Sequence, residues 1–380
     1  MTIMKKVLLF TLAIMLSCAS SYSQNRRIQP RKASSAAAAK KPRIVTTAKY
    51  ELSAKYVHVS DDVIYYVEKG DNNAVMAINR QSGEVTTVIP GIAGIYEGAR
   101  QRIYSVGTCS GKLLFLNDKG GVYIYDGKSV ETSKYLSHSY NFHMAGRHHA
   151  LIETDKETDQ LWLWDIDNMK VIAKFPRLRP FDDYLDYTPV AIDDAGNIWV
   201  RRGFVFMRIT PSGEKSYYDL STENYVKNER ESHTRFNDKV VKKSGDYLYY
   251  AYGRRIYRIN MSAPAGWEEY AKIPPTEDKM FDNYAVDRQG NILTCGNGMG
   301  RQSYEIEYYA VGAFDSPKAL GTQIPTGIGD GKIWMTLCKV SADNDGNFVL
   351  MSEDGMAIYL YNPNGLVGYN KARGTIIKLK

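Results

Sequence analysis

The sequence predicts an all-β fold made of similar sheet units, and three observations lead to that prediction. Seven times along the chain, an apolar or aromatic run of four or five residues is followed by a polar turn and a second such run. Short runs rich in Tyr, Val, Ile and Trp, bounded by turn residues, are typical of β-strands. Turns of Asp, Asn, Gly and Pro recur between the runs, and no stretch keeps a helical period over three turns.

The units repeat with a period near 47 residues. Their first runs are 63–67, 113–116, 149–152, 197–200, 247–250, 291–294 and 347–351. Their second runs end at Asn79, Asp126, Asp165, Thr210, Asn260, Gly312 and Asn362, which are 39 to 52 residues apart. Seven units of this period predict a single β-propeller, in which blades of about four antiparallel strands pack around an axis. Several units are degenerate, so six or eight blades remain alternatives.

Two kinds of turn indicate the order of the strands. The motif Asp-x-x-Gly-Asn precedes a first run at 193–197, 287–291 and 343–347. Glycine supplies the positive φ of such a turn, and the aspartate can accept hydrogen bonds from its backbone. A second kind is expected to join the third strand of a blade to the fourth, at 79–83, 210–213 and 362–365. Residues 375–379 are a candidate strand that closes the ring against residues 43–59.

The repeated D-x-x-G-N-[IF] motif, followed by a hydrophobic run, resembles the blades of NHL-type propellers and of the periplasmic sensor propellers of two-component regulators. The resemblance covers most of residues 50–380 and is architectural. It implies the propeller fold and no catalytic residue, because these motifs mark hairpins. Units two and three depart from the motif, with Cys109–Lys112 and Gly146–His149 at the expected turn.

The N-terminus predicts export. Residues 1–23 contain two lysines followed by the apolar run 7–16, which is much shorter than the roughly 20 residues of a membrane-spanning helix. Cleavage after Ser23 gives an ending similar to the export signals of Bacteroides-type bacteria. The alternative is an outer-membrane lipoprotein acylated at Cys18. We therefore expect a periplasmic or extracellular protein with no transmembrane span in the mature chain.

The net charge of +7 is concentrated near the N-terminus. Residues 24–55 carry nine basic side chains and one acidic, whereas residues 56–380 carry 38 basic and 41 acidic. Such a tail is typical of a solvated spacer. We expect a flexible basic arm at 24–49 and the propeller at 50–380. A nucleic-acid-binding arm is the alternative, but an exported protein rarely meets that partner, so we expect no nucleic acid.

Motifs for chemistry are few. Cys109, Cys295 and Cys338 remain after processing, and an odd number without a CxxC pair favours buried thiols, although one disulfide stays open. Residues 107–111 have the spacing of a nucleophile elbow, but a strand rather than a helix is expected after them. Residues 343–346 resemble the start of a calcium loop, yet the flanking ligand positions are serines, which favours a plain turn.

Histidines gather in one stretch of the sequence. They are His138, His143, His148 and His149. Strand alternation does not place His143 beside His149, and many histidine pairs are structural. We therefore expect no metal site and no cofactor.

The segments between blades predict the position of a binding site. In a propeller these segments and the loops from second to third strands gather on one face around the axis, where ligands usually bind. Here they combine aromatic residues with carboxylates, amides and histidines, which suits sugars or peptides. Tyr187, Phe236 and Phe281 have the alternative role of packing the inner strands. The candidate ligand-binding residues are His143, Asp182, Asp183, Tyr184, His233, Arg235, Asp282 and Asn283.

Two functions follow from this arrangement. The first is a monomeric binding or interaction scaffold whose ligand is a glycan, a peptide or an envelope protein. The second is a propeller hydrolase or lyase, in which Asp182, Asp183, His233 and Asp282 supply acid, base or metal-binding groups. No catalytic residue is identified by a motif, so the sequence favours the first function.

Overall fold

The computed structural model describes eighteen segments of the chain, all within the unit Ile44–Lys380. They are residues 47–51, 54–59, 63–68, 74–89, 103–117, 122–128, 130–132, 141–153, 160–176, 188–220, 241–274, 279–298, 303–320, 324–325, 339–343, 345–351, 357–367 and 375–376. The expected signal peptide, Cys18 and residues 24–46 of the expected arm lie outside the described residues. These segments form strands and turns without an α-helix, so the predicted all-β class is confirmed.

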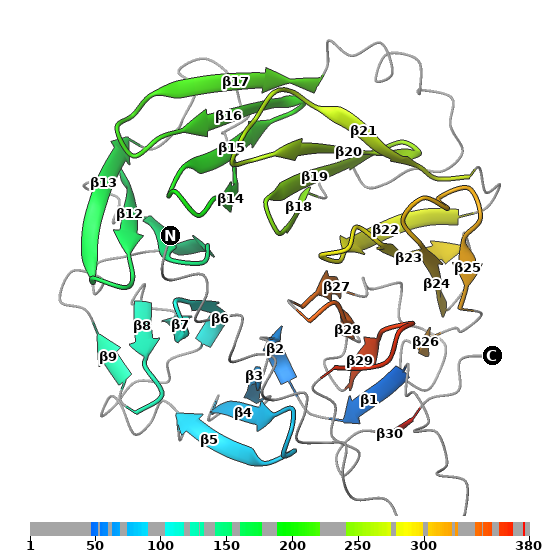
Figure 1. Ribbon diagram of the computed structural model, residues 1–380. Helices are drawn as coiled ribbons and strands as arrows, with labels where there is room; N and C mark the ends of the chain where they lie inside the picture. The colour runs from blue at the N-terminus through cyan, green and yellow to red at the C-terminus, as the bar shows by residue number, and fades with distance from the viewer. Residues whose placement is uncertain are drawn as a thin grey trace, which may run out of the picture. The chain divides into compact units, whose positions relative to one another are not determined.

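Seven antiparallel sheets form the blades of one propeller, as predicted (Figure 1). The first three blades are β2 (Ala54–Val59), β3 (Val63–Glu68), β4 (Val75–Asn79) and β5 (Val85–Ile89); β6 (Ile103–Cys109), β7 (Lys112–Asn117), β8 (Val122–Tyr125) and β9 (Val130–Thr132); and β10 (Asn141–Ala145), β11 (His149–Glu153), β12 (Gln160–Asp165) and β13 (Lys170–Pro176).

Blades 4 to 6 continue the same pattern around the ring. They are β14 (Thr188–Ile192), β15 (Ile198–Arg202), β16 (Val205–Ile209) and β17 (Lys215–Asp219); β18 (Val241–Ser244), β19 (Tyr247–Tyr252), β20 (Arg255–Asn260) and β21 (Glu268–Lys272); and β22 (Lys279–Val286), β23 (Ile292–Gly298), β24 (Ser303–Tyr309), β25 (Lys318–Ala319) and β26 (Ile324–Pro325).

Blade 7 contains strands from both ends of the chain. Its strands are β27 (Lys339–Ala342), β28 (Phe348–Met351), β29 (Ala357–Tyr361), β1 (Thr47–Glu51) and β30 (Thr375–Ile376), in that order across the sheet. The ring therefore closes through β1, which pairs antiparallel with β29 on one side and β30 on the other. The predicted pairing of residue 375 onward with the N-terminal segment is confirmed. Strand β1 also draws residues 47–49, from the range expected to be the arm, into the propeller.

One predicted connection is wrong in blade 7. The turn at 362–365 follows the third strand, but the fourth strand of the sheet is β1 rather than a segment after the turn. The sheet accepts β1 because its pairing with β29 is in register over five residues. The corresponding turns at 79–83 and 210–213 do join third strands to fourth strands, as predicted.

The hydrophobic core is divided among the junctions between blades. Seven clusters of buried side chains each combine residues of two neighbouring sheets. At the junction of blades 4 and 5, for example, Trp199 packs with Leu248 and Tyr250. The junction of blades 7 and 1 is packed in the same way, with Leu360 against Ile64. Because burial of such a side chain contributes about 1.5–3 kcal/mol, the clusters stabilise the ring at every junction, including the one where it closes.

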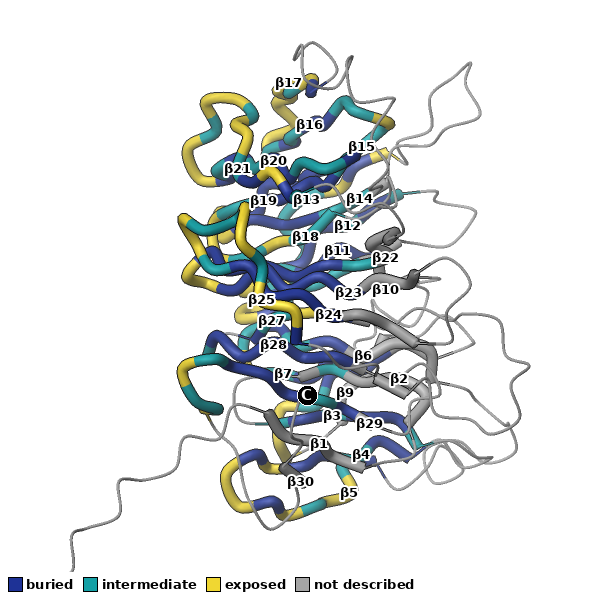
Figure 2. The backbone as a smooth tube through the Cα atoms, turned by 90° about the vertical axis from the view of Figure 1, so that its right-hand side faces the viewer, coloured by how far each residue is buried: buried dark blue, intermediate teal, exposed yellow. Residues whose placement is uncertain are grey.

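The Asp-x-x-Gly-Asn turns have the geometry that their sequence predicts. In blade 6, the backbone N–H of Asn291 donates to Oδ1 of Asp287, and its side-chain amide donates to Oδ2, both over 2.8 Å. Gly290, with φ of 91°, lies against the Tyr270 side chain, which leaves no room for a Cβ atom. The same pair of bonds occurs in blades 4 and 7. Figure 2 shows buried backbone along the strands and exposed residues in the turns on one side of the ring.

No helix long and apolar enough to cross a membrane occurs among the described residues.

Candidate functional site at the centre of the ring

The structure describes the backbone of three of the eight predicted ligand-binding residues. His143 lies on β10 and Asp282 and Asn283 lie on β22, which are the innermost strands of blades 3 and 6. The side-chain amide oxygen of Asn283 accepts a hydrogen bond from the N–H of Tyr284. The other five residues, Asp182, Asp183, Tyr184, His233 and Arg235, lie outside the described residues, so whether the eight converge stays a prediction.

The innermost strands share an irregularity that sequence reasoning did not predict. In blades 1, 2, 3, 4 and 6, one residue of this strand has no partner on the second strand, which is the register shift of a β-bulge. The extra residues are Lys55, Tyr104, His143, Val190 and Asp282. Bulges are frequent beside binding sites. Two of the predicted binding residues thus occupy bulges on the strands nearest the axis.

Strand register defines a layer of seven residues around the axis, one from each innermost strand. Each member pairs with a second-strand residue whose side chain packs in the core cluster shared with the next blade. Lys242 pairs with Tyr249 in this way, and Ala285 pairs with Leu293. The seven members, called the central layer below, are His58, Gly107, Met144, Ala191, Lys242, Ala285 and Ser341.

The central layer has small residues on four of its seven strands. They are Gly107, Ala191, Ala285 and Ser341. Ser341 is exposed to solvent, although it lies on the innermost strand of blade 7. Solvent therefore reaches the blade 7 side of the central layer.

Lys242 is the cationic member of the central layer. Its amine donates a 3.1 Å hydrogen bond to the carbonyl oxygen of Val340. Val340 lies on the innermost strand of blade 7, two blades away, so the side chain passes the inner edge of blade 6 to reach it. Burial lowers the pKa of the amine to about 8, and desolvation is the cause. No described carboxylate forms an ion pair with this amine.

His58 is the second titratable member of the layer. Its Nε2 atom forms a 2.8 Å hydrogen bond with Oγ1 of Thr108, on the innermost strand of blade 2. Burial lowers the pKa of the imidazole to about 4, so the ring is neutral at neutral pH. Among the titratable members of the layer, Lys242 alone then carries a charge at that pH.

Lys243, next to Lys242, faces the opposite side of β18 and has a different environment. Its amine donates a 2.7 Å hydrogen bond to the carbonyl oxygen of Ile192 on blade 4. Burial lowers the pKa of this amine, while three nearby carboxylates oppose the shift. It lines a pocket of about 220 Å³ between the turns of blades 4 and 5, with Asp193, Asp246 and Arg208 among its other residues. Lys243 is thus balanced by carboxylates.

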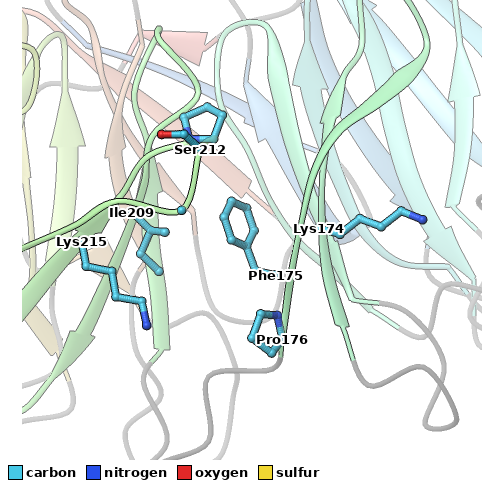
Figure 3. Close-up of a pocket in the computed structure, with 8 residues that line it drawn as sticks. Lys174, Phe175, Pro176, Ile209, Ser212 and Lys215 are labelled. Atoms are coloured by element: carbon cyan, nitrogen blue, oxygen red, sulfur yellow. The ribbon is translucent and has the colours of Figure 1, made fainter.

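A shallow pocket lies at the outside of the ring (Figure 3). It has a volume of about 200 Å³ and lies between β13 and the turn that joins β16 to β17. Phe175 and Ile209 form its apolar wall, and Lys174 and Lys215 flank it. It contains no carboxylate, histidine or thiol that could act as a catalytic group.

The segments that resemble a nucleophile elbow and a calcium loop have structural roles. Cys109 is followed by strand β7, as predicted, and burial raises the pKa of its thiol to about 12, which disfavours the nucleophilic thiolate. Cys295 is also buried, and Cys338 lies outside the described residues. The turn beginning at Asp343 holds Arg80 rather than presenting a calcium loop.

His148 and His149 have different contacts. Nδ1 of His148 lies 2.9 Å from Oδ2 of Asp167, and the other oxygen of this carboxylate accepts a hydrogen bond from the hydroxyl of Ser110. His149 packs its ring against Gly196 of the next blade, and desolvation lowers its pKa. Both therefore have structural contacts between turns.

The described part of the central layer contains one half-buried cation and neutral polar groups. Sequence reasoning missed Lys242 and His58 because neither innermost strand carries a strong apolar pattern. The missed signal was the doublet Lys242-Lys243, which is followed by Ser244, the two-residue turn 245–246 and the apolar strand 247–252. Pairing with that strand would have placed one lysine on each face of an inner strand.

Comparisons with known proteins give the fold and no family. No family model matches the chain, and no curated protein matches it. The solved structure of YCF48 bound to D1 peptide is similar with a TM-score of 0.51 and 10% identity, covering 85% of this chain and 97% of that one.

Two further solved structures have lower scores. Streptogramin B lyase matches with a TM-score of 0.47 and 13% identity, over 84% of this chain and 98% of that one. The extracellular domain of the one-component system BT4673 from B. thetaiotaomicron matches with 0.48 and 13%, over 85% of this chain and 41% of that one. At these identities the likeness concerns the fold. The architectural resemblance to propellers that the sequence predicts is confirmed.

Proposed function

We propose that the protein is an exported, monomeric binding propeller that holds a peptide or glycan over the end of the ring where the innermost strands begin. The observation that carries the proposal is the bulge on five innermost strands. Four of the five extra residues are polar or charged, namely Lys55, Tyr104, His143 and Asp282. They precede the central layer in the chain, so they lie toward that end of the strands.

The predicted segments between blades add the remaining binding residues at the same end. In this proposal, Asp182, Asp183 and His233 bind hydroxyl or amide groups, while Tyr184 covers an apolar face of the ligand. Arg235 and Asn283 supply further donors. Such a mixture fixes a neutral polar ligand by several hydrogen bonds and one stacking contact.

The test is titration of the purified protein against panels of glycans, peptides and envelope proteins. A saturable ligand should appear, and Asp182→Ala and Asp282→Ala should each weaken its binding about tenfold or more, the loss of one or two hydrogen bonds to charged groups. Tyr217→Ala, on the exposed outer strand of blade 4, is the control and should change nothing. Binding that is indifferent to both aspartate changes would contradict the proposed site. Multiple-turnover product formation lost in Asp182→Ala would instead favour a hydrolase or lyase.

Export is a separate part of the proposal. The signal peptide is residues 1–23, the basic arm follows, and the mature protein starts at Gln24. Mass spectrometry of the N-terminal peptide from the secreted protein tests this directly. A peptide that begins with Gln24 supports simple secretion, whereas a lipid-modified Cys18 supports the lipoprotein alternative.

A further inference from the structure

The centre of the ring contains a half-buried positive charge that the proposed function does not use. The amine of Lys242, on blade 5, donates a hydrogen bond to the carbonyl oxygen of Val340, on blade 7. Among the described residues, this is the amine's one hydrogen bond. An ammonium group has three N–H donors. Two donors are therefore available to another acceptor on the axis side of Val340.

Burial of an ammonium without a counter-charge is unfavourable, and proteins usually supply an anion or move the charge to water. The fall of the Lys242 pKa to about 8 has desolvation as its cause, without a described charge that acts on it. Lys243 differs in this respect, because Asp193, Asp194 and Asp246 oppose the fall of its pKa. The lysine inside the ring is the one that lacks a described anion.

Solvent reaches this level of the ring on the blade 7 side. Ala285, the central-layer residue of blade 6, is buried in the core between blades 6 and 7. Ser341, which follows Val340, is exposed to solvent and offers a hydroxyl beside the amine's acceptor. Solvent access is therefore found beside the carbonyl oxygen that the amine of Lys242 contacts.

The charge of the layer selects the class of ligand. His58 is neutral and its Nε2 already bonds to Thr108, so the described layer offers one positive charge. One charge matches a monoanion better than a phosphate, which carries close to two negative charges at neutral pH. A carboxylate accepts two charge-assisted hydrogen bonds, which equals the number of spare donors.

We propose that the centre of the propeller is a carboxylate-binding site in which the ammonium of Lys242 is the counter-ion and Ser341 is a neighbouring donor. The carboxylate comes from a uronic acid or from the C-terminus of a peptide, which share this chemistry. The site is independent of the ligand-binding face proposed above, so either can fail without the other.

The experiment uses the purified full chain and pairs of probes that differ in the carboxylate alone. The pairs are glucuronate with glucose, and N-acetylalanine with its amide, and saturation-transfer NMR measures binding. The carboxylate of at least one pair should bind and its neutral partner should not, and the pair that responds identifies the source. Binding by neither carboxylate, or equal binding by the neutral partners, overturns the proposal.

Lys242→Met and Lys243→Met are matched variants. Lys242→Met should weaken carboxylate binding about tenfold or more, as expected for lost charge-assisted bonds, whereas Lys243→Met should leave it unchanged. Equal loss in both variants overturns the assignment to the centre of the ring.

A second measurement follows the amine of Lys242 in the native protein and uses a variant for assignment alone. Reductive ¹³C-methylation labels the lysines, and the signal of Lys242 is assigned by its absence in Lys242→Arg. A saturating carboxylate should raise the pKa of the labelled amine toward its ordinary value, because the anion stabilises the charged form. An unchanged pKa with bound carboxylate overturns the proposal.

Discussion

Arg80 of blade 1 and Asp343 of blade 7 form an ion pair across the junction where the ring closes. Nη2 of Arg80 lies 2.9 Å from Oδ2 of Asp343, and both side chains are fully buried. Nη2 also donates to the carbonyl oxygen of Val367. At the junction of blades 4 and 5, Met261 stands at the position that corresponds to Arg80, and a pocket opens beside Asp193. The buried pair thus replaces that pocket where the two ends of the chain meet.

Arg80→Met should destabilise the protein by about 3–5 kcal/mol, because Asp343 would keep a buried charge without its partner. Chemical unfolding in urea measures the loss, and adding Asp343→Asn should recover part of it. Arg208→Met is the control, since its 3.8 Å contact with Asp193 is partly exposed and should contribute less than about 1 kcal/mol. Equal effects of the two arginine changes would contradict a special role for the closing junction.

His58 should make the protein less stable in mild acid. Its pKa is about 4 in the folded state and near 6.5 when unfolded, so the unfolded chain binds the proton first as the pH falls. Stability should decrease between pH 6.5 and 4, by on the order of 2–3 kcal/mol from this residue. His58→Gln should flatten this part of the urea-unfolding profile. A profile with the same slope in the variant would show that His58 is not buried as a neutral ring.

Lys242 should change the stability of the protein in the alkaline range. Its pKa is about 8 in the folded state against an ordinary 10.5, so the folded protein loses this proton first and stability should rise from pH 8 to 10.5. Lys242→Met should therefore be more stable than the native protein near pH 7, with a difference that narrows as the pH rises. Urea midpoints at pH 7, 8.5 and 10 measure it. A difference that stays constant across this range would contradict the desolvated amine.

The buried Asp–Asn turns should contribute more to the free energy of unfolding than exposed turns of similar geometry. Asn291→Ala removes the bond that the side-chain amide donates to Asp287 and the bond that the side-chain oxygen accepts from the N–H of Val311. It keeps the backbone bond but should still cost about 2–3 kcal/mol, because Asp287 would lose a partner while buried. Asn168→Ala, whose bonds to Asp165 are exposed, is the control and should cost less than about 1 kcal/mol. Thermal unfolding of both variants makes the comparison.

The sequence predicted the strands that have their own apolar pattern. The first runs became the second strands of the blades and the second runs became the third strands, as at 63–67 and 197–200. Local side-chain alternation and turn chemistry determine these strands, so one segment is enough to recognise them. The expected boundary between the arm and the propeller, after residue 49, fell inside β1, although residues 43–59 were expected to pair with residues 375–379. The pairing of β1 with β29 places residues 47–49 in the sheet as well.

The site was less predictable, because contacts between distant segments determine where its residues lie. Arg80 lies in a turn motif that reads as exposed, and its burial depends on Asp343, which is far away in the sequence. Lys242 and His58 belong to innermost strands whose register is known only from the folded sheet. Of the predicted binding residues, three lie on innermost strands rather than in the segments between blades where the sequence analysis placed them, namely His143, Asp282 and Asn283.

The closed ring is the claim on which the central layer and both binding proposals depend, and hydrogen exchange at β29 tests it most directly. A chain that starts at Ile44 retains β1, whereas one that starts at Ser53 lacks it. The amides of Ala357–Tyr361 that pair with β1 should be protected in the first chain and exchange rapidly in the second. Equal protection in both chains would contradict closure of the ring by the N-terminal strand.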